Sequence, residues 1–314
     1  MTRILFMGSD PIAIPLLETL RDHPDVELTS ILTQPDRPSG RGKKLRPNAI
    51  KAWALEHGLD IRDPEKPSEA EIEWVQDQQI ELSLVMAYGH ILKKKLLDTP
   101  PGGSWNFHAS LLPKHRGASP IESAILAGDS ETGVSLMQII PKMDAGPVLD
   151  VERVLITEED TSPTLREKLS QACCPLISRN LPQLLDGTAN PTSQDESQVT
   201  YCSKIHKSHG QLDFTKTAQQ IHQQVRAYTP WPGSYFDLND IRIKVAQPQV
   251  LTSPTSASPG TILQADASGL QVATSEGTIN FQQLQRPGGK MLPAADFFRG
   301  FEISVGLGIL RMET

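Results

Sequence analysis

Asn106 and His108 are the residues whose types and spacing are best suited to chemistry. They stand two apart in the stretch SWNFHASLLPKHRG, residues 104–117. In an extended segment, residues two apart face the same side, so Trp105 and Phe107 are expected to point into the core. A buried polar group without a partner costs stability, so the amide and the imidazole need partners at this strand end. The pair is therefore a candidate for catalysis as well as for structure.

Asp144, in the stretch MDAG, is the natural third member of this set. It lies between two apolar runs and just before Gly146, so a turn could carry its carboxylate to the same edge. A carboxylate beside an imidazole favours the protonated ring. Asn106 and His108 could then both donate to one developing oxyanion. No serine or cysteine here has nucleophile-elbow spacing, so the pattern favours acyl transfer without a covalent intermediate.

The elements that position these residues alternate between buried strands and amphipathic helices. Strands are expected at residues 3–8, 26–33, 81–89 and 104–110, and helices at residues 11–23, 47–58 and 119–129. This alternation predicts an α/β fold with a Rossmann-like, mostly parallel sheet covered on both faces. Ligands of such sheets bind outside the carboxyl ends of the strands, where Asn106 and His108 are expected.

The pattern changes after this alternation. Residues 133–140 and 147–156 are expected to form a hairpin or two later strands, and residues 161–187 a long helix. Ser162 is a suitable N-cap for that helix and Gly187 a suitable stop.

The domain boundaries follow from composition. We expect a catalytic domain at residues 1–188, a polar linker at 189–207, and a small OB-like β-barrel domain at 208–314. One helix, at residues 217–228, precedes short strands separated by turn residues in the last domain, which is typical of small barrels or sandwiches.

The composition limits the classes of protein that fit. With 314 residues, 38% hydrophobic and 21% charged, the chain can form two globular domains. It has no apolar run of 18 residues and no signal-peptide pattern, so we expect a cytoplasmic protein without a membrane partner. Its three cysteines, Cys173, Cys174 and Cys202, lack zinc or disulfide spacing, so we expect reduced thiols and no metal site.

Residues 33–47, TQPDRPSGRGKKLRP, carry a concentration of positive charge around a single acid, Asp36. The basic residues are Arg37, Arg41, Lys43, Lys44 and Arg46. Prolines and glycines indicate an irregular loop that projects into solvent. The net charge of −7 argues against nucleic-acid binding over the whole surface, but not against a local basic patch. The loop is either simply solvated or a phosphate or nucleic-acid contact.

Two glycine-containing strand ends complete the predicted edge. VMAYGHIL, residues 85–92, is either an ordinary end of a central strand or a ligand contact, where Gly89 allows a sharp turn that exposes backbone groups. FMGSDP, residues 6–11, lacks the G-x-G-x-x-G pattern of a dinucleotide site. It favours a tight turn into a helix capped by Ser9 or Asp10.

These residues carry a family resemblance. NFHASLLPKHRGASP resembles the motif N-x-H-x-S-L-L-P-x-x-R-G-x-x-P of the 10-formyltetrahydrofolate-dependent formyltransferases, and GVSLMQIIPKMDAG resembles their segment with the catalytic Asp. The basic loop, the strand end VMAYGHIL and YTPWPGSY, at the start of a C-terminal barrel, are similar to those of the members that act on initiator methionyl-tRNA. The resemblance covers essentially the whole chain, although His115 and His90 replace a bulky aromatic and an apolar residue.

The resemblance implies a reaction and a set of contacts. A formyl group would pass from 10-formyltetrahydrofolate to the α-amine of methionine on initiator tRNA. Asn106 and His108 would stabilise the oxyanion, while Asp144 would orient His108 and hold a proton-carrying water. The implied folate contacts are Ala87, Tyr88, Gly89, His90, Ile91, Leu92, Ser110, Leu111, Leu112 and Pro113. The implied tRNA contacts are Arg37, Arg41, Lys43 and Lys44, with phosphate contacts from the barrel domain. We expect a monomer.

Two other classes remain open at this point. A small-molecule formyltransferase acting on a purine-pathway amine or an amino sugar would share the catalytic residues. The purine enzyme would need no barrel domain, and the sugar enzyme would need no basic loop. A non-catalytic nucleotide-binding module would not need Asn106, His108 and Asp144 together.

Overall fold

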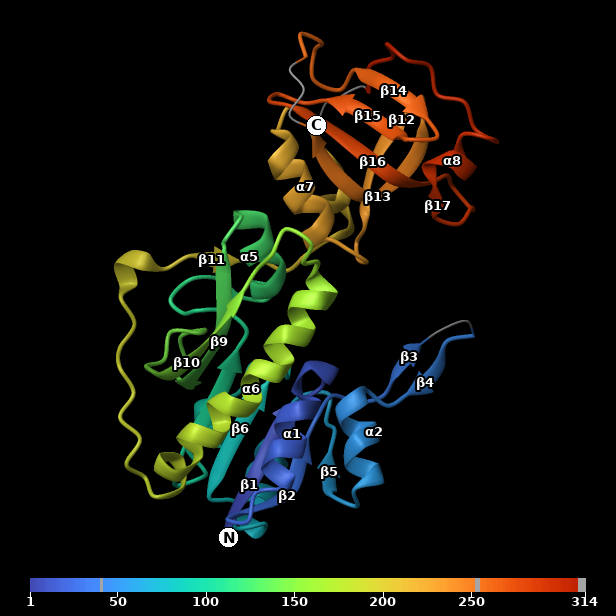
Figure 1. Ribbon diagram of the computed structural model, residues 1–314. Helices are drawn as coiled ribbons and strands as arrows, with labels where there is room; N and C mark the ends of the chain where they lie inside the picture. The colour runs from blue at the N-terminus through green and yellow to red at the C-terminus, as the bar shows by residue number, and fades with distance from the viewer. Residues whose placement is uncertain (40–41, 252–254, 310–314) are drawn as a thin grey trace. The chain divides into compact units, whose positions relative to one another are not determined.

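The computed structural model describes residues 1–39, 42–251 and 255–309. These residues form two compact units that are each discontinuous in sequence (Figure 1). The first unit contains Met1–Pro120, Glu131–Leu155 and Arg166–Cys202, and the second contains Ile121–Ser130, Ile156–Leu165 and the chain from Ser203 onward.

A seven-stranded sheet forms the centre of the first unit. In spatial order its strands are β10 (Val148–Leu155), β9 (Glu131–Gln138), β7 (Ser104–His108), β6 (Leu82–Met86), β1 (Thr2–Gly8), β2 (Val26–Leu32) and β5 (Asp60–Arg62). The strands from β7 to β5 pair in parallel, whereas β9 is antiparallel to both β7 and β10. The predicted parallel α/β sheet and the predicted β9–β10 hairpin are therefore confirmed.

Helices cover both faces of this sheet. They are α1 (Ile14–Arg21), α2 (Ala49–Glu56), α3 (Glu69–Asp77), α4 (Lys94–Leu97) and α6 (Ser162–Leu185), whereas α5 (Pro120–Ala127) belongs to the second unit after Pro120. Figure 1 shows α1 and α6 on one face, where Cys173 of α6 contacts Met86 of β6. On the other face, Trp74 of α3 and Leu96 of α4 pack in one cluster with Val85 of β6. The sheet is therefore buried on both sides, which suits its continuous apolar strands.

The pairing of β6 with β7 places the catalytic candidates. Val85 is the register partner of Asn106, and Leu84 is the partner of Trp105. Trp105 and Phe107 are 4% and 2% exposed, as the alternation of side chains along a strand predicts.

Strand β5 and helix α3 are among the elements that the sequence did not predict. Strand β5 has only three residues, too few for a hydrophobic period to be visible. Helix α3 begins with a capping box, in which the Ser68 amide donates to Glu71 and the Ala70 amide donates to the Ser68 hydroxyl. This S-x-x-E pattern was available in the sequence as a start signal.

The basic segment is not an irregular loop, as was predicted, but carries an antiparallel hairpin. Strands β3 (Arg37–Ser39) and β4 (Lys44–Arg46) pair with each other and with neither large sheet. Figure 1 shows β3 and β4 standing away from the seven-stranded sheet. Positive φ angles at Gly42 and Lys43, +94° and +48°, turn the chain back before β4.

The second unit contains an antiparallel sheet with a helix packed on it. Its strands are β12 (Ser234–Leu238), β13 (Ile241–Leu251), β14 (Ile262–Asp266), β15 (Gly269–Ala273), β16 (Thr278–Gln285) and the short β17 (Leu292–Pro293). Helix α7 (Ala218–Ala227) buries Ile221 and Val225 in one cluster with Phe236 and Phe281, and α8 (Ala294–Phe297) follows β17. The predicted mixed α/β chain with a smaller β domain at its end is confirmed.

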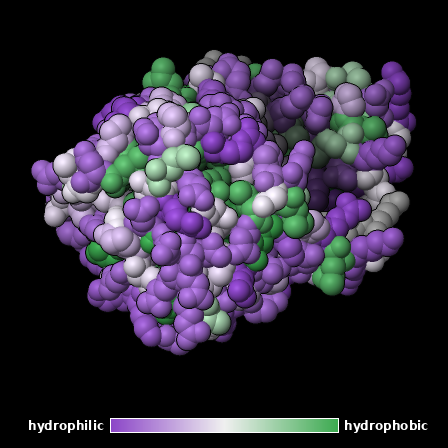
Figure 2. Space-filling view, turned by 90° about the horizontal axis from the view of Figure 1, so that it is seen from below, coloured by the Kyte–Doolittle hydropathy of each residue, from purple (hydrophilic) through white to green (hydrophobic). Residues whose placement is uncertain are grey.

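The visible surface is mostly hydrophilic (Figure 2). In Figure 2, hydrophilic residues cover most of the visible face and apolar residues occur in separate groups. No helix within the described ranges is both long and apolar enough to cross a bilayer. Cys173, Cys174 and Cys202 form no disulfide within the described residues, and burial raises the pKa of Cys173.

Candidate active site

His108, at the end of β7, is held by two groups on opposite sides of its ring. Its Nε2 atom lies 2.9 Å from the carbonyl oxygen of His115, so Nε2 carries a proton and donates it to that carbonyl. Its Nδ1 atom lies 3.8 Å from Oδ2 of Asp144. With Nε2 engaged, Nδ1 is the ring atom left for chemistry.

The loop after β7 is folded so that His115 presents its carbonyl to His108. The Ser110 hydroxyl donates to the carbonyl of Lys114, and the Ser135 hydroxyl donates to the carbonyl of Ser110. Ser135 also accepts a bond from the Leu112 amide. His115 has a positive φ of +56°, a conformation uncommon for residues other than glycine. Such a conformation persists only where the surrounding bonds determine it, as they do here.

Asp144 lies in the turn between β9 and β10, and the structure brings it beside His108. Its Oδ2 atom accepts a bond from the Gly117 amide at 2.8 Å, and its own φ is +49°. Gly146 is required two residues later, because a Cβ atom there would lie 1.7 Å from the Gln138 carbonyl oxygen. The close approach of Gly146 to Gln138 thus shapes the turn that presents the carboxylate.

Asn106 is partly exposed and shares the face of β7 on which His108 lies. Its side-chain amide makes no hydrogen bond to any residue that the structure describes. An amide that is half-buried and without a protein partner is available to donate to a ligand.

The arrangement of these three residues suits the stabilisation of negative charge on an acyl oxygen. Asn106 offers amide protons and His108 offers Nδ1, which donates when the ring is protonated. Asp144 supplies the negative charge beside that ring.

The strand end after β6 is a second part of this edge. Ala87 has a φ of +50°, and its carbonyl accepts a bond from the Ser9 hydroxyl at 3.0 Å. The Tyr88 carbonyl accepts a bond from Gln34 Nε2 at 2.8 Å. Gly89 has a φ of +79°, and a Cβ atom there would lie 2.5 Å from Gln34 Nε2. Bonds from two neighbouring strand ends therefore fix the backbone of this segment.

The side chains of this segment alternate between exposed and buried positions. Ala87, Gly89 and Ile91 are exposed, Ile91 by 97%. The Tyr88 ring is buried, and desolvation raises the pKa of its hydroxyl, which has no partner among the described residues. His90 contacts Tyr88 edge to face, and Leu92 packs against the neighbouring apolar cluster.

The second predicted folate segment lies in the loop after β7. Leu111, Leu112 and Pro113 are half-buried, and the Leu112–Pro113 bond is cis. Ser110 is completely buried and its hydroxyl is already bonded to Lys114. Ser110 thus shapes the loop in this structure, and a folate contact by its hydroxyl stays a prediction.

The predicted tRNA contacts differ in their surroundings. Arg37 forms a two-bond ion pair with Glu65, at 3.0 and 2.7 Å. Lys43 and Lys44 are exposed and make no ion pair within the described ranges. Arg41 lies outside the described residues. The hairpin therefore offers Lys43 and Lys44 as available cations.

Asp36, at the base of this hairpin, shares a lysine with a second acid. Lys51 of α2 lies 2.6 Å from a carboxylate oxygen of Asp36 and 2.7 Å from one of Asp63. The bond to Asp36, and after it the bond to Asp63, raises the pKa of Lys51. Lys51 is therefore engaged by these two carboxylates and is not among the available cations of this region.

The sequence reading missed residues that hold the catalytic turn. Within residues 189–207, where a linker was expected, β11 (Tyr201–Cys202) pairs in parallel with β8 (Arg116–Gly117). Gln194, in the same segment, bonds to the carbonyls of Asp144 and Gly146. No local pattern reveals this, because Gln194 and its other partner, Arg116, are 78 residues apart in sequence.

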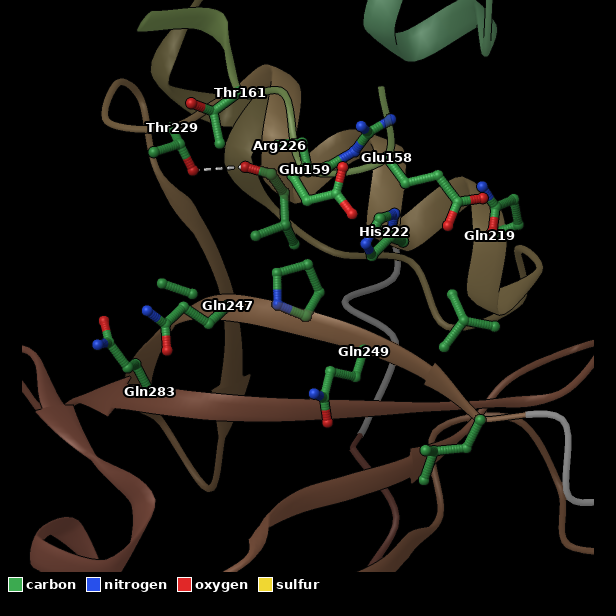
Figure 3. Close-up of a pocket in the computed structure, with 15 residues that line it drawn as sticks. Glu158, Glu159, Thr161, Gln219, His222, Arg226, Thr229, Gln247, Gln249 and Gln283 are labelled. Atoms are coloured by element: carbon green, nitrogen blue, oxygen red, sulfur yellow. Dashed lines mark hydrogen bonds between the residues drawn. The ribbon is translucent and has the colours of Figure 1, made fainter. Parts of the chain in front are cut away.

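A separate cavity of about 910 Å³ lies in the second unit, between α7, β13 and residues 158–161 (Figure 3). His222 and Arg226 of α7, Glu159, and Gln247 and Gln249 of β13 line it. None of the catalytic candidates lines this cavity. The described residues contain no group of three or more His, Cys, Asp or Glu side chains arranged for a metal ion.

Known proteins resemble this chain over its whole length. Residues 2–180 match the formyl transferase family, and residues 204–302 match the formyl transferase C-terminal domain. The methionyl-tRNA formyltransferase of Bacillus subtilis (strain 168) is 39% identical over 308 residues, which are 98% of this chain and 97% of that protein. The methionyl-tRNA formyltransferase of Hydrogenovibrio crunogenus is 38% identical over 304 residues, 96% of this chain and 97% of that protein.

Solved structures share the fold at lower identity. An N-formyltransferase from Helicobacter canadensis, in complex with folinic acid and dTDP-3-aminofucose, aligns with a TM-score of 0.68 at 20% identity, over 91% of this chain and 100% of that one. HypX from Aquifex aeolicus, in complex with tetrahydrofolic acid, aligns with a TM-score of 0.60 at 14% identity, over 94% of this chain but 46% of that one. From the family match and the full-length relatives together, this chain belongs to the formyl transferase family, among its methionyl-tRNA formyltransferases.

Proposed function

We propose that this chain transfers the formyl group of 10-formyltetrahydrofolate to the α-amine of methionine on initiator Met-tRNA, and that Asn106, His108 and Asp144 carry out the transfer. The observation that supports these roles is the end of β7, where Asn106 and His108 share one face of the strand and the Asp144 carboxylate lies 3.8 Å from His108 Nδ1. Full-length relatedness to methionyl-tRNA formyltransferases supports the acceptor.

In this mechanism the amine nitrogen attacks the formyl carbon directly. The carbonyl electron pair moves onto oxygen, where the Asn106 amide and the protonated His108 ring at Nδ1 donate to it. The bond between the formyl carbon and N10 of the folate then breaks, the carbonyl re-forms, and the proton lost by the amine goes to N10. Asp144 keeps a negative charge 3.8 Å from Nδ1, which favours the donating form of the ring.

The folate is proposed to lie along the backbone of residues 87–92 and against Leu111, Leu112 and Pro113. Its rings would contact backbone groups that the bonds from Ser9 and Gln34 hold in place. This placement agrees with the rule that ligands of open α/β sheets bind beyond the carboxyl ends of the strands.

The tRNA is proposed to contact the β3–β4 hairpin through Lys43, Lys44 and Arg41, with a smaller contribution from Arg37 because Glu65 engages it. Residues 1–188 are proposed as the catalytic domain, 189–207 as the connection and 208–314 as the domain that contacts the stem of the tRNA. A monomer in the cytoplasm, where initiator tRNA is used, completes the proposal.

Formyl transfer from labelled 10-formyltetrahydrofolate tests this function. The protein should label initiator Met-tRNA, and should label free methionine or an amino-sugar nucleotide far more slowly. Labelling of a small amine in preference to Met-tRNA would refute the proposed acceptor, and no labelling of any amine would refute formyl transfer.

A further inference from the structure

Asp144 is held at its backbone by a polar chain that comes from the segment after α6. Gln194 Nε2 donates to the Asp144 carbonyl at 2.9 Å and to the Gly146 carbonyl at 2.7 Å. Both protons of one side-chain amide therefore close the turn that presents the carboxylate.

The amide of Gln194 is fixed in turn by a buried arginine. Its Oε1 atom accepts bonds from Nε and Nη2 of Arg116, at 3.0 and 2.8 Å. Arg116 is 0% exposed, and its Nη2 atom also donates to Glu196 at 2.9 Å. Because a guanidinium donates and never accepts, these bonds fix which end of the Gln194 amide faces Asp144.

The same polar chain reaches the other side of the catalytic carboxylate. Arg116 precedes Gly117, whose amide donates to Asp144 Oδ2, and both residues form β8, paired with β11. The Arg116 amide donates to the Thr200 carbonyl, and the His115 amide donates to the Thr200 hydroxyl. The segment 194–202 thus touches the supports of both Asp144 and His108.

We infer that Gln194, oriented by Arg116, is a positioning residue for the transfer reaction, acting through the Asp144 turn. The inference rests on the proposed function. Asp144 has a φ of +49°, so its conformation depends on surrounding bonds. Without the Gln194 amide, the turn keeps the Gly117 bond to the carboxylate but loses both bonds to its backbone.

The substitution Gln194→Glu removes both donated protons, sets a carboxylate oxygen against the carbonyls of Asp144 and Gly146, and keeps the acceptor for Arg116. A glutamate still accepts both bonds from Arg116, now as an ion pair, but it has no protons for the carbonyls of Asp144 and Gly146. We expect kcat for formyl transfer to fall by about tenfold or more through misplacement of the carboxylate, with KM for Met-tRNA and folate nearly unchanged. Gln194→Asn keeps the amide but shortens it, and should show a loss of the same kind.

Gln198→Glu is the matched control. Gln198 lies in the same segment and is exposed. Among the described residues, its side-chain amide donates only to Asp195. This variant should retain wild-type kcat.

A double-mutant cycle with Asp144→Asn separates positioning from general destabilisation. If Gln194 acts through Asp144, then Gln194→Glu should add little further loss in the Asp144→Asn background. A purely structural role would instead give losses that multiply.

The inference is overturned if either folded Gln194 variant keeps kcat within about twofold of wild type, or if its loss multiplies with that of Asp144→Asn. The wild-type protein assayed alongside distinguishes the two claims. No transfer by wild type contradicts the proposed function, whereas normal wild-type transfer with unaffected Gln194 variants contradicts only the role of Gln194.

Discussion

The Nε2 atom of His108 donates to the carbonyl oxygen of His115 at 2.9 Å. This bond fixes which ring nitrogen carries a proton in the neutral imidazole and turns Nδ1 toward Asp144. The group that orients the His108 ring is thus the backbone carbonyl of His115, in the loop after β7, while the Asp144 carboxylate lies 3.8 Å from Nδ1.

Removing either oxyanion donor should lower kcat while leaving the fold intact. Asn106→Ala removes an amide that bonds to none of the residues described in the structure, so stability should change little. The loss of one such donor typically lowers kcat by about 10²–10³-fold. Steady-state kinetics with Met-tRNA provides the measurement, and a near wild-type kcat in the Asn106 variant contradicts the assigned role.

Asp144→Asn should keep the turn but lose the charge. The amide oxygen still accepts the bond from Gly117, so the melting temperature should stay close to wild type. The site then lacks the negative charge that lies 3.8 Å from His108 Nδ1, and kcat should fall by a factor on the order of 10²–10⁴. Binding of folate, measured by calorimetry, should persist. Full activity in this variant is incompatible with the mechanism.

The hairpin lysines should control recognition of tRNA. The variant with Lys43→Ala and Lys44→Ala should raise KM for Met-tRNA and make its affinity less dependent on salt, by about one unit of slope for each lost phosphate contact. KM for folate should not change. Lys94→Ala with Lys95→Ala is the control, because Asp98 and Glu69 pair with those lysines. Equal salt dependence in the two double variants argues for a hairpin that is only solvated.

Gly89→Ala should weaken folate binding more than it weakens the fold. A Cβ atom at Gly89 would clash with Gln34 Nε2 and displace the bond that Gln34 donates to the Tyr88 carbonyl. The positive φ adds a strain of about 1–2 kcal/mol for any residue with a Cβ atom. Gly58→Ala carries the same kind of strain, at a φ of +66°, with no atom within 4 Å of the added group. The Gly89 variant should therefore show a raised KM for folate that the Gly58 variant lacks, and equal KM values count against this folate site.

The ion pair in which Glu196 accepts from Arg116 should weaken in acid. Bonds from Arg116 and then Lys142 hold the pKa of Glu196 below its ordinary value of 4.5. Because the pKa of Glu196 is lower in the folded than in the unfolded protein, its carboxylate contributes its full stabilisation above pH 4.5. This contribution is lost as the pH falls below that value. The difference in melting temperature between wild type and Glu196→Gln should thus be largest at neutral pH and should approach zero in acid. A difference that persists unchanged below pH 4.5 contradicts this account.

Local patterns in the sequence predicted most of the fold. The apolar runs that form β1, β2 and β6 and the apolar stripe of α1 follow from side-chain periodicity, as does the shared face of Asn106 and His108. A cap at Ser9 or Asp10 was also predicted, because a capping residue acts on amides close to it in sequence, and Asp10 accepts the bond from the Ile12 amide.

Long-range partners account for what the sequence did not reveal. The β3–β4 hairpin pairs Arg37 with Arg46, so its charged residues carry no apolar alternation that would mark strands. The polar segment with Gln194 looks like a linker until Arg116 and the Asp144 turn are placed beside it. The bond from His108 to His115 likewise depends on the backbone path of a loop, not on the identity of a side chain.

Competition between acceptors tests the central claim most directly. Wild-type protein is given labelled 10-formyltetrahydrofolate with initiator Met-tRNA, an amino-sugar nucleotide and free methionine in one mixture, and His108→Ala is assayed beside it. The account predicts that label appears on the α-amine of Met-tRNA, and that the His108 variant loses about 10²–10³-fold in rate. Label on the amino sugar in preference to the tRNA, or equal rates for the two proteins, would contradict it.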